Sequence, residues 1–81
     1  MIPRLLTRTG CCLCDQFHEA WRAAFPGVSL DHVDIDRWPE LRERYGARIP
    51  VLLDGNDAVV CEGHFDEEAC AALVHTMTGP R

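Results

Sequence analysis

Three cysteines fall within four residues near the start of the chain, at Cys11, Cys12 and Cys14. They stand where a short apolar run, Arg4–Thr7, gives way to apolar residues that recur at helical spacing as far as Pro26. We interpret the first segment as a strand and the second as a helix. A Cys-x-x-Cys pair therefore lies at a strand-to-helix junction, and this placement constrains the fold and the chemistry together.

The position of this pair suits thiol chemistry. Residues three apart at a helix start share a face, so the sulfurs of Cys11 and Cys14 can form a disulfide with little backbone strain. The free amides of the first helical turn stabilise a thiolate and lower its pKa. We expect Cys11, outside the helix proper, to be exposed and to attack, and Cys14 to be buried and to resolve the mixed disulfide. Arg8 favours the thiolate, whereas Asp15 opposes it.

The remaining segments predict an alternating α/β chain. In chain order, the expected elements are a strand at Val28–Ile35, a helix between Asp36 and Gly46, strands at 49–53 and Ala58–Cys61 that form a hairpin, and a helix from Asp66 to Gly79-Pro80. The alternation of the first of these strands shifts near Asp31-His32, which suggests a bulge. Asp36 and Asp66 are the expected N-caps.

The element order is β-α-β-α-β-β-α. The first two strands, joined by a helix, should be parallel with a right-handed crossover, and the last two should be antiparallel. We predict an α/β fold with one mixed four-stranded sheet and helices on both faces, forming a single domain over residues 1–81.

Composition narrows the functional classes. The chain carries 8 Lys and Arg against 13 Asp and Glu, which argues against nucleic-acid binding. The longest apolar run, near Ile49–Leu53, is far too short to span a membrane. The first ten residues lack the apolar core of an export signal, so we expect a cytoplasmic protein. Five cysteines, an odd number, do not suit a secreted disulfide scaffold and favour redox or metal chemistry.

Pro50 is the second informative residue. A proline at the start of an interior strand removes one ladder hydrogen bond. It could be an ordinary trans proline, but a cis Ile49–Pro50 bond would leave the backbone beside Cys11 free to pair with an extended thiol substrate. We favour the cis form.

Three motifs together resemble the glutaredoxin family. Residues 8–14, R-T-G-C-C-L-C, resemble the glutaredoxin opening K-T-x-C-P-Y-C, and Ile49-Pro50-Val51 resembles its T-V-P segment. Gly63-His64-Phe65-Asp66 stands where glutaredoxins carry G-G-x-D before the last helix. More narrowly, C-x-L-C-D with R-x-P-V-L resembles a group of short, mostly bacterial glutaredoxin-like proteins. The resemblance covers essentially the whole chain.

The resemblance implies a thioredoxin fold with the sheet order second, first, third, fourth strand. It also implies that Cys11 is the nucleophile, Cys14 the resolving thiol and Pro50 the cis-proline. Glutathione would be a co-substrate rather than a tightly bound cofactor. It would lie near a set of backbone and charged groups, namely Arg8, Ile49, Pro50, Gly63 and Asp66. The chain departs from the family at Cys12-Leu13, which replaces Pro-Tyr, and at His64, which replaces the second glycine. These departures bear on glutathione binding, not on the dithiol.

Three functional hypotheses follow. The first is a small, monomeric thiol–disulfide oxidoreductase that acts on a disulfide or glutathionylated protein or a small thiol substrate, and is regenerated by glutathione or by a reductase partner. The second is a metal module on the same fold, with either an iron–sulfur cluster on Cys11 or zinc held by Cys11, Cys14, Cys61 and His64. The third is a non-catalytic scaffold. The favoured prediction assigns no metal ligands, and Cys12, Cys61 and Cys70 receive no role.

Overall fold

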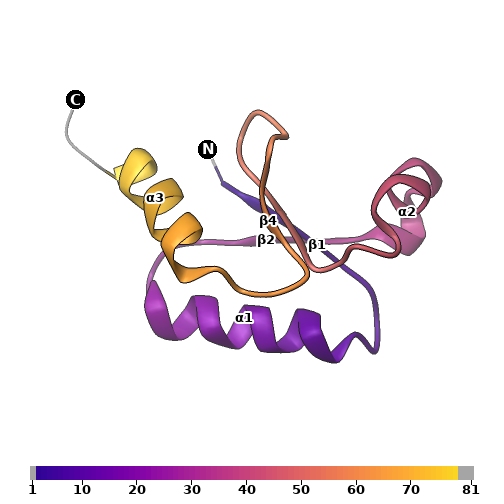
Figure 1. Cartoon of the computed structure of the whole chain (residues 1–81), viewed down its shortest axis with the longest axis horizontal. Coiled ribbons are helices and arrows are strands. Elements are labelled where there is room, and N and C mark those ends of the chain that lie inside the picture. Colours follow the sequence, from indigo (N-terminus) through magenta and orange to yellow (C-terminus); the bar gives the residue numbers. More distant parts are fainter. Residues whose placement is uncertain (1, 79–81) are drawn as a thin grey trace.

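The computed structural model describes residues 2–78 and shows a sheet with three α-helices (Figure 1). Its elements in chain order are β1 (Arg4–Thr7), α1 (Cys12–Ala24), β2 (Asp31–Asp34), a short 3-10 helix (Ile35–Arg37), α2 (Pro39–Tyr45), β3 (Val51–Leu53), β4 (Val59–Glu62) and α3 (Glu67–Thr78). The predicted order β-α-β-α-β-β-α is therefore confirmed. The predicted end of the last helix at Gly79-Pro80 lies outside the described residues.

The four strands form one mixed sheet in the order β2-β1-β3-β4. Strand β1 runs parallel to β2 and antiparallel to β3, and β4 returns antiparallel to β3. This is the mixed four-stranded sheet and the strand order that the family resemblance implied, and it is the arrangement of a thioredoxin fold.

Helices cover both faces of the sheet, as predicted. One buried cluster joins the sheet to α1 and α3 and contains Leu5, Phe17, Trp21, Leu52 and Cys70. A second cluster on the opposite face joins the sheet to α2 and contains Leu6, Ile35, Tyr45, Val51 and Leu53. Because side chains alternate along a strand, neighbours such as Leu5 and Leu6 supply the two clusters in turn.

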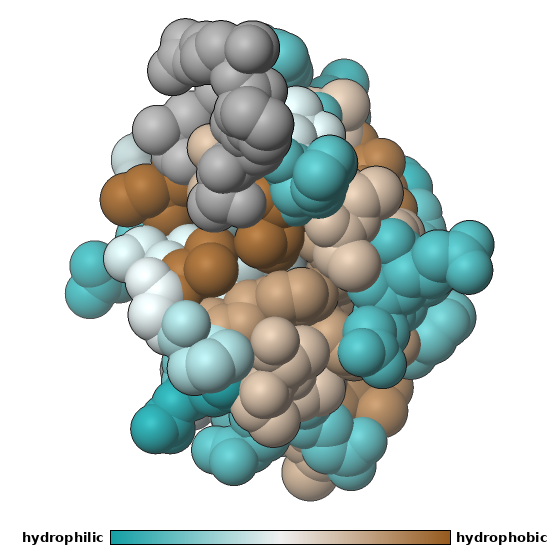
Figure 2. Space-filling view, turned by 90° about the vertical axis from the view of Figure 1, so that its left-hand side faces the viewer, coloured by the Kyte–Doolittle hydropathy of each residue, from teal (hydrophilic) through white to brown (hydrophobic). Residues whose placement is uncertain are grey.

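Helix α3 lies at one end of the molecule (Figure 1). Several of its apolar residues stay half-buried, among them Leu73 and Met77. Figure 2, which faces this end, shows hydrophobic side chains bordered by hydrophilic ones. Within residues 2–78, every helix is too short or too polar to cross a lipid bilayer.

Strand β2 begins at Asp31, so the prediction of a strand from Val28 was wrong. The carbonyl of Val28 accepts a hydrogen bond from the indole N–H of Trp21 at 3.0 Å, and its own N–H donates to Phe25 in a turn. These contacts hold the segment away from the ladder until the N–H of Asp31 donates to the carbonyl of Pro3. The β1–β2 register is continuous, so the expected bulge is absent there.

The predicted N-cap at Asp36 was also wrong. Helix α2 begins at Pro39 with Trp38 as its N-cap, and no side chain caps it. Asp36 instead lies within the 3-10 helix, where its N–H donates to the carboxylate of Asp34. By contrast, Asp66 accepts a hydrogen bond from the N–H of Ala69 in the first turn of α3, as an N-cap does.

The hairpin is shorter than expected on one side. Strand β3 begins at Val51, after Pro50, and β4 is displaced by one residue, to Val59–Glu62. An irregularity in the pairing falls between Leu52 and Leu53. Asp54 closes the turn by accepting hydrogen bonds from the backbone N–H groups of two turn residues, Asn56 and Ala58.

Candidate active site

Cys11 and Cys14 form a disulfide at the beginning of α1, with their Cα atoms 5.2 Å apart. Cys11 is the N-cap residue in extended conformation, and its sulfur accepts a hydrogen bond from the N–H of Cys14 at 3.1 Å. Cys11 is half-buried, whereas Cys14 is only 3% exposed. The less buried of the two cysteines is therefore also the one whose sulfur a helix amide stabilises.

The strand registers bring three separate segments to the same edge of the sheet. Leu6 on β1 pairs with Val51 on β3, and Val51 pairs with Glu62 on β4. The chain that leaves β1 toward Cys11, the Pro50 that enters β3 and the loop that follows β4 therefore emerge together. This edge is where the family resemblance expects a thiol substrate to lie.

Two of the expected substrate-binding segments are linked directly. The N–H of Gly63 donates a hydrogen bond to the carbonyl of Pro50 at 2.7 Å. The Ile49–Pro50 peptide bond is cis, and Gly63 has a left-handed φ of 82°. Asp66, at the end of the same loop, is occupied as the N-cap of α3. Ile49 is half-buried and packs against the cluster beneath α2.

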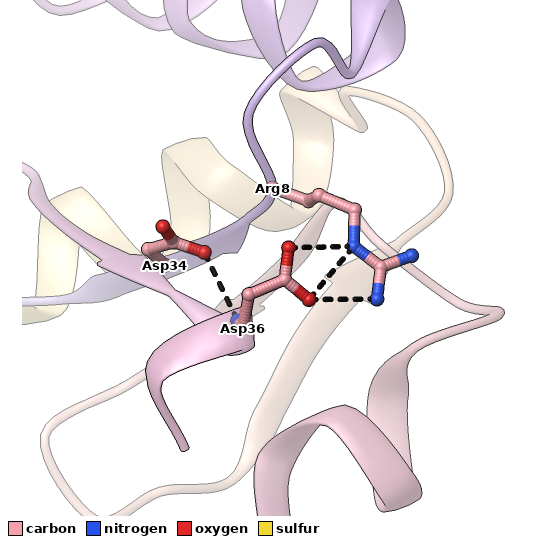
Figure 3. A network of polar contacts seen from close by, with 3 residues as sticks. All are labelled: Arg8, Asp34 and Asp36. Atoms are coloured by element: carbon pink, nitrogen blue, oxygen red, sulfur yellow. Dashed lines mark hydrogen bonds and ion pairs between the residues drawn. The ribbon is translucent and has the colours of Figure 1, made fainter. Parts of the chain in front are cut away.

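Arg8 is engaged in an ion pair that the sequence did not suggest (Figure 3). Its guanidinium donates through Nε and Nη2 to the carboxylate of Asp36 at 2.9–3.1 Å. This contact lowers the pKa of Asp36 and raises that of Arg8. The charge expected to favour the Cys11 thiolate is therefore partly balanced by a carboxylate from the segment after β2.

A cavity of about 390 Å³ lies beside Cys14. It is lined by Cys14 and, among others, by His18, His32, Asp15 and Arg8. The imidazole rings of His18 and His32 pack edge to face with centroids 4.5 Å apart. Partial burial and the charge of His18 lower the pKa of His32. His18 follows Cys14 by four residues on α1, and both side chains line this cavity.

The other cysteines occupy three different environments. Cys12 is exposed beside the disulfide, next to Leu13, which is 51% exposed. Cys61 and Cys70, which lie on different elements, bring their sulfurs to 3.8 Å. Sequence reasoning treated these two as unrelated, and only their positions on apolar faces of the predicted strand and helix could have hinted at the pairing.

The zinc hypothesis names four ligands that the structure does not bring together, since Cys11 and Cys14 are bonded to each other. It required Cys61 and His64 to join Cys11 and Cys14, all of which are described. Across residues 2–78, no three side chains among histidine, cysteine, aspartate and glutamate gather closely enough to hold a metal ion.

Comparison with known proteins identifies the class. Residues 4–75 match the family described as Glutaredoxin-like domain (DUF836), and the chain belongs to this family. No functionally curated protein matches significantly.

Two solved structures share the fold. One is the X-ray structure of target protein XcR50 from X. campestris, which is 34% identical, with a TM-score of 0.75 over 91% of this chain and 96% of that one. The other is the solution NMR structure of protein Ne2328 from Nitrosomonas europaea, which is 26% identical, with a TM-score of 0.78 over 88% of this chain and 87% of that one.

Proposed function

We propose that this glutaredoxin-like protein is a small thiol–disulfide oxidoreductase. The observation that carries the proposal is the asymmetry of the pair. Cys11 is the half-exposed N-cap of α1 and accepts the N–H of Cys14, while Cys14 is buried one turn further on. An accessible, amide-stabilised sulfur with a protected neighbour is what a two-step exchange requires.

In the proposed reaction, the Cys11 thiolate attacks one sulfur of a substrate disulfide. A mixed disulfide forms on Cys11, and the other substrate half leaves as a thiolate that takes up a proton. The Cys14 sulfur then attacks Cys11, releases the second substrate thiol and forms the Cys11–Cys14 disulfide. Two electrons pass to the substrate, and an external dithiol or two glutathione molecules must restore the reduced pair.

Glutathione is the proposed co-substrate, and the proposed substrates are disulfide-containing or glutathionylated proteins or small thiol compounds. The shared edge of the sheet and the contact between Gly63 and Pro50 support a binding groove there. Arg8 would contribute to it only by exchanging part of its contact with Asp36. The proposed setting is the cytoplasm, where a monomer with three free cysteines would stay reduced.

The test is turnover of a glutathionylated peptide, with glutathione and its reductase in one arm and a protein dithiol reductase in the other. Cys11→Ser should abolish turnover in both arms. Cys14→Ser should accumulate a covalent mixed disulfide on Cys11, visible by mass spectrometry. The matched control is Cys12→Ser, which removes an exposed neighbouring thiol and should keep turnover near that of the unmodified protein. Full turnover by Cys11→Ser would refute the mechanism.

A second measurement separates the oxidoreductase from an inert scaffold. The rate of Cys11 alkylation in the reduced protein should reach half its maximum at a pH below the ordinary thiol value of about 8.5. A midpoint at the ordinary value would favour the scaffold. The expected reduction potential lies between values typical of thioredoxin and glutaredoxin, roughly −270 to −200 mV.

A further inference from the structure

A second pair of sulfurs, distinct from the Cys11–Cys14 disulfide, lies between β4 and α3. The Sγ atoms of Cys61 on β4 and Cys70 on α3 are 3.8 Å apart and in hydrogen-bond contact. A disulfide bond has a sulfur–sulfur distance of about 2.05 Å, so a small movement of the two side chains would bring the sulfurs within bonding distance. Both cysteines are free thiols in the structure.

The pairing follows from the register of the sheet. Leu5 on β1 pairs with Leu52 on β3, and Leu52 pairs with Cys61 on β4. These three side chains therefore form one row on the face covered by α1 and α3. Cys70 belongs to the same buried cluster as Leu5 and Leu52.

The two sulfurs differ in accessibility. Strand β4 is an edge strand, and Cys61 is half-buried, whereas Cys70 is completely buried. A soluble reagent can therefore reach Cys61 first. This repeats the division between a half-exposed and a buried cysteine that distinguishes Cys11 from Cys14.

The surroundings also favour charge on Cys61 over Cys70. The hydrogen bond from the Cys70 thiol, with a second one from the backbone of Asp66, lowers the pKa of Cys61, although burial and the Asp66 carboxylate oppose the shift. The same contact and burial raise the pKa of Cys70. Lower burial and the direction of the pKa shifts therefore both favour Cys61 as the attacking sulfur of this pair.

We propose that Cys61 and Cys70 form a second dithiol, which reacts with small disulfides such as glutathione disulfide and closes to a bond between β4 and α3. The Cys61 thiolate attacks the small disulfide and forms a mixed disulfide, and the small thiolate that leaves takes up a proton from solvent. The Cys70 thiol then loses its proton to solvent as its sulfur attacks Cys61, and the second small thiolate leaves and is protonated in turn. Two protein thiols are oxidised and one small disulfide is reduced, so atoms and electrons balance.

The test uses the full-length chain with Cys11→Ser, Cys12→Ser and Cys14→Ser, so its outcome does not depend on the oxidoreductase proposal. After incubation of the folded protein with glutathione disulfide, cleavage at acidic residues separates the two cysteines, because Glu62, Asp66, Glu67 and Glu68 lie between them. The expected result is loss of both thiols, with the two fragments joined and no glutathione retained.

Two control variants and one comparison with the original protein test the order of the two steps. Adding Cys70→Ala should leave glutathione attached to Cys61, and adding Cys61→Ser should leave Cys70 unmodified. The same incubation with the protein that keeps all five cysteines does not depend on whether the variants fold. In that protein, Cys12 should retain glutathione while Cys61 and Cys70 form a disulfide. The proposal is overturned if both residues remain thiols, if Cys61 keeps glutathione beside a free Cys70, or if closure occurs only in urea.

Discussion

Trp21 packs α1, the helix that carries Cys14, against the sheet. It is 1% exposed, lies in the cluster between α1 and the sheet, and donates its indole N–H to the carbonyl of Val28 at 3.0 Å. Replacement by phenylalanine keeps an aromatic ring but removes this donor and part of the ring volume. The chain also offers a matched control, because Trp38 is 57% exposed.

The expected cost of Trp21→Phe can be worked from these contacts. Loss of the donor to a partly buried carbonyl costs about 1 kcal/mol, at the lower end for such groups because water can reach Val28 in part. The unfilled ring volume adds about 1 kcal/mol. The sum of about 2 kcal/mol is a large part of the roughly 4–12 kcal/mol expected for a domain of this size.

Urea unfolding followed by far-ultraviolet circular dichroism measures this cost without relying on tryptophan fluorescence. With a slope of about 1 kcal/mol per molar urea, Trp21→Phe should lower the midpoint by about 2 M. Trp38→Phe should change the free energy of unfolding by no more than about 0.5 kcal/mol. Equal midpoints for the two variants would refute the claim that Trp21 anchors α1.

Two further predictions concern pH and backbone strain. Because partial burial and the charge of His18 lower the pKa of His32 in the folded chain, its contribution to stability is present above the unfolded value of about 6.5 and is lost over the pH range below it. His32→Gln should therefore flatten the pH dependence of the urea midpoint in that range. His18→Gln should raise the pKa of His32 measured by NMR. An unchanged His32 titration in the His18→Gln variant would exclude the proposed interaction between the rings. Gly63→Ala should lower the free energy of unfolding by about 1–2 kcal/mol through its left-handed φ alone, since an added Cβ meets no atom within 4 Å. Gly63→Asn should cost less, and equal costs for alanine and asparagine would point to another cause.

Much of the fold was accessible from local sequence signals. The apolar repeat after Cys12 and the N-cap at Asp66 each depend on residues within a few positions of one another, so the helices they begin were predicted closely. One boundary that failed depends on a contact with a residue outside the segment itself. Strand β2 starts late because Trp21 binds Val28, and no local pattern between Val28 and Asp31 reveals that contact.

In the candidate site, too, local features were predictable from the sequence and contacts between distant segments were not. The sequence by itself determined that Cys11 and Cys14 stand together at a helix start, because three residues of spacing settle their proximity wherever the helix lies. Only the tertiary structure decided that Asp36 holds Arg8 and that Cys61 meets Cys70. These contacts depend on strand order and register, which bring segments together that share no local signal in the chain.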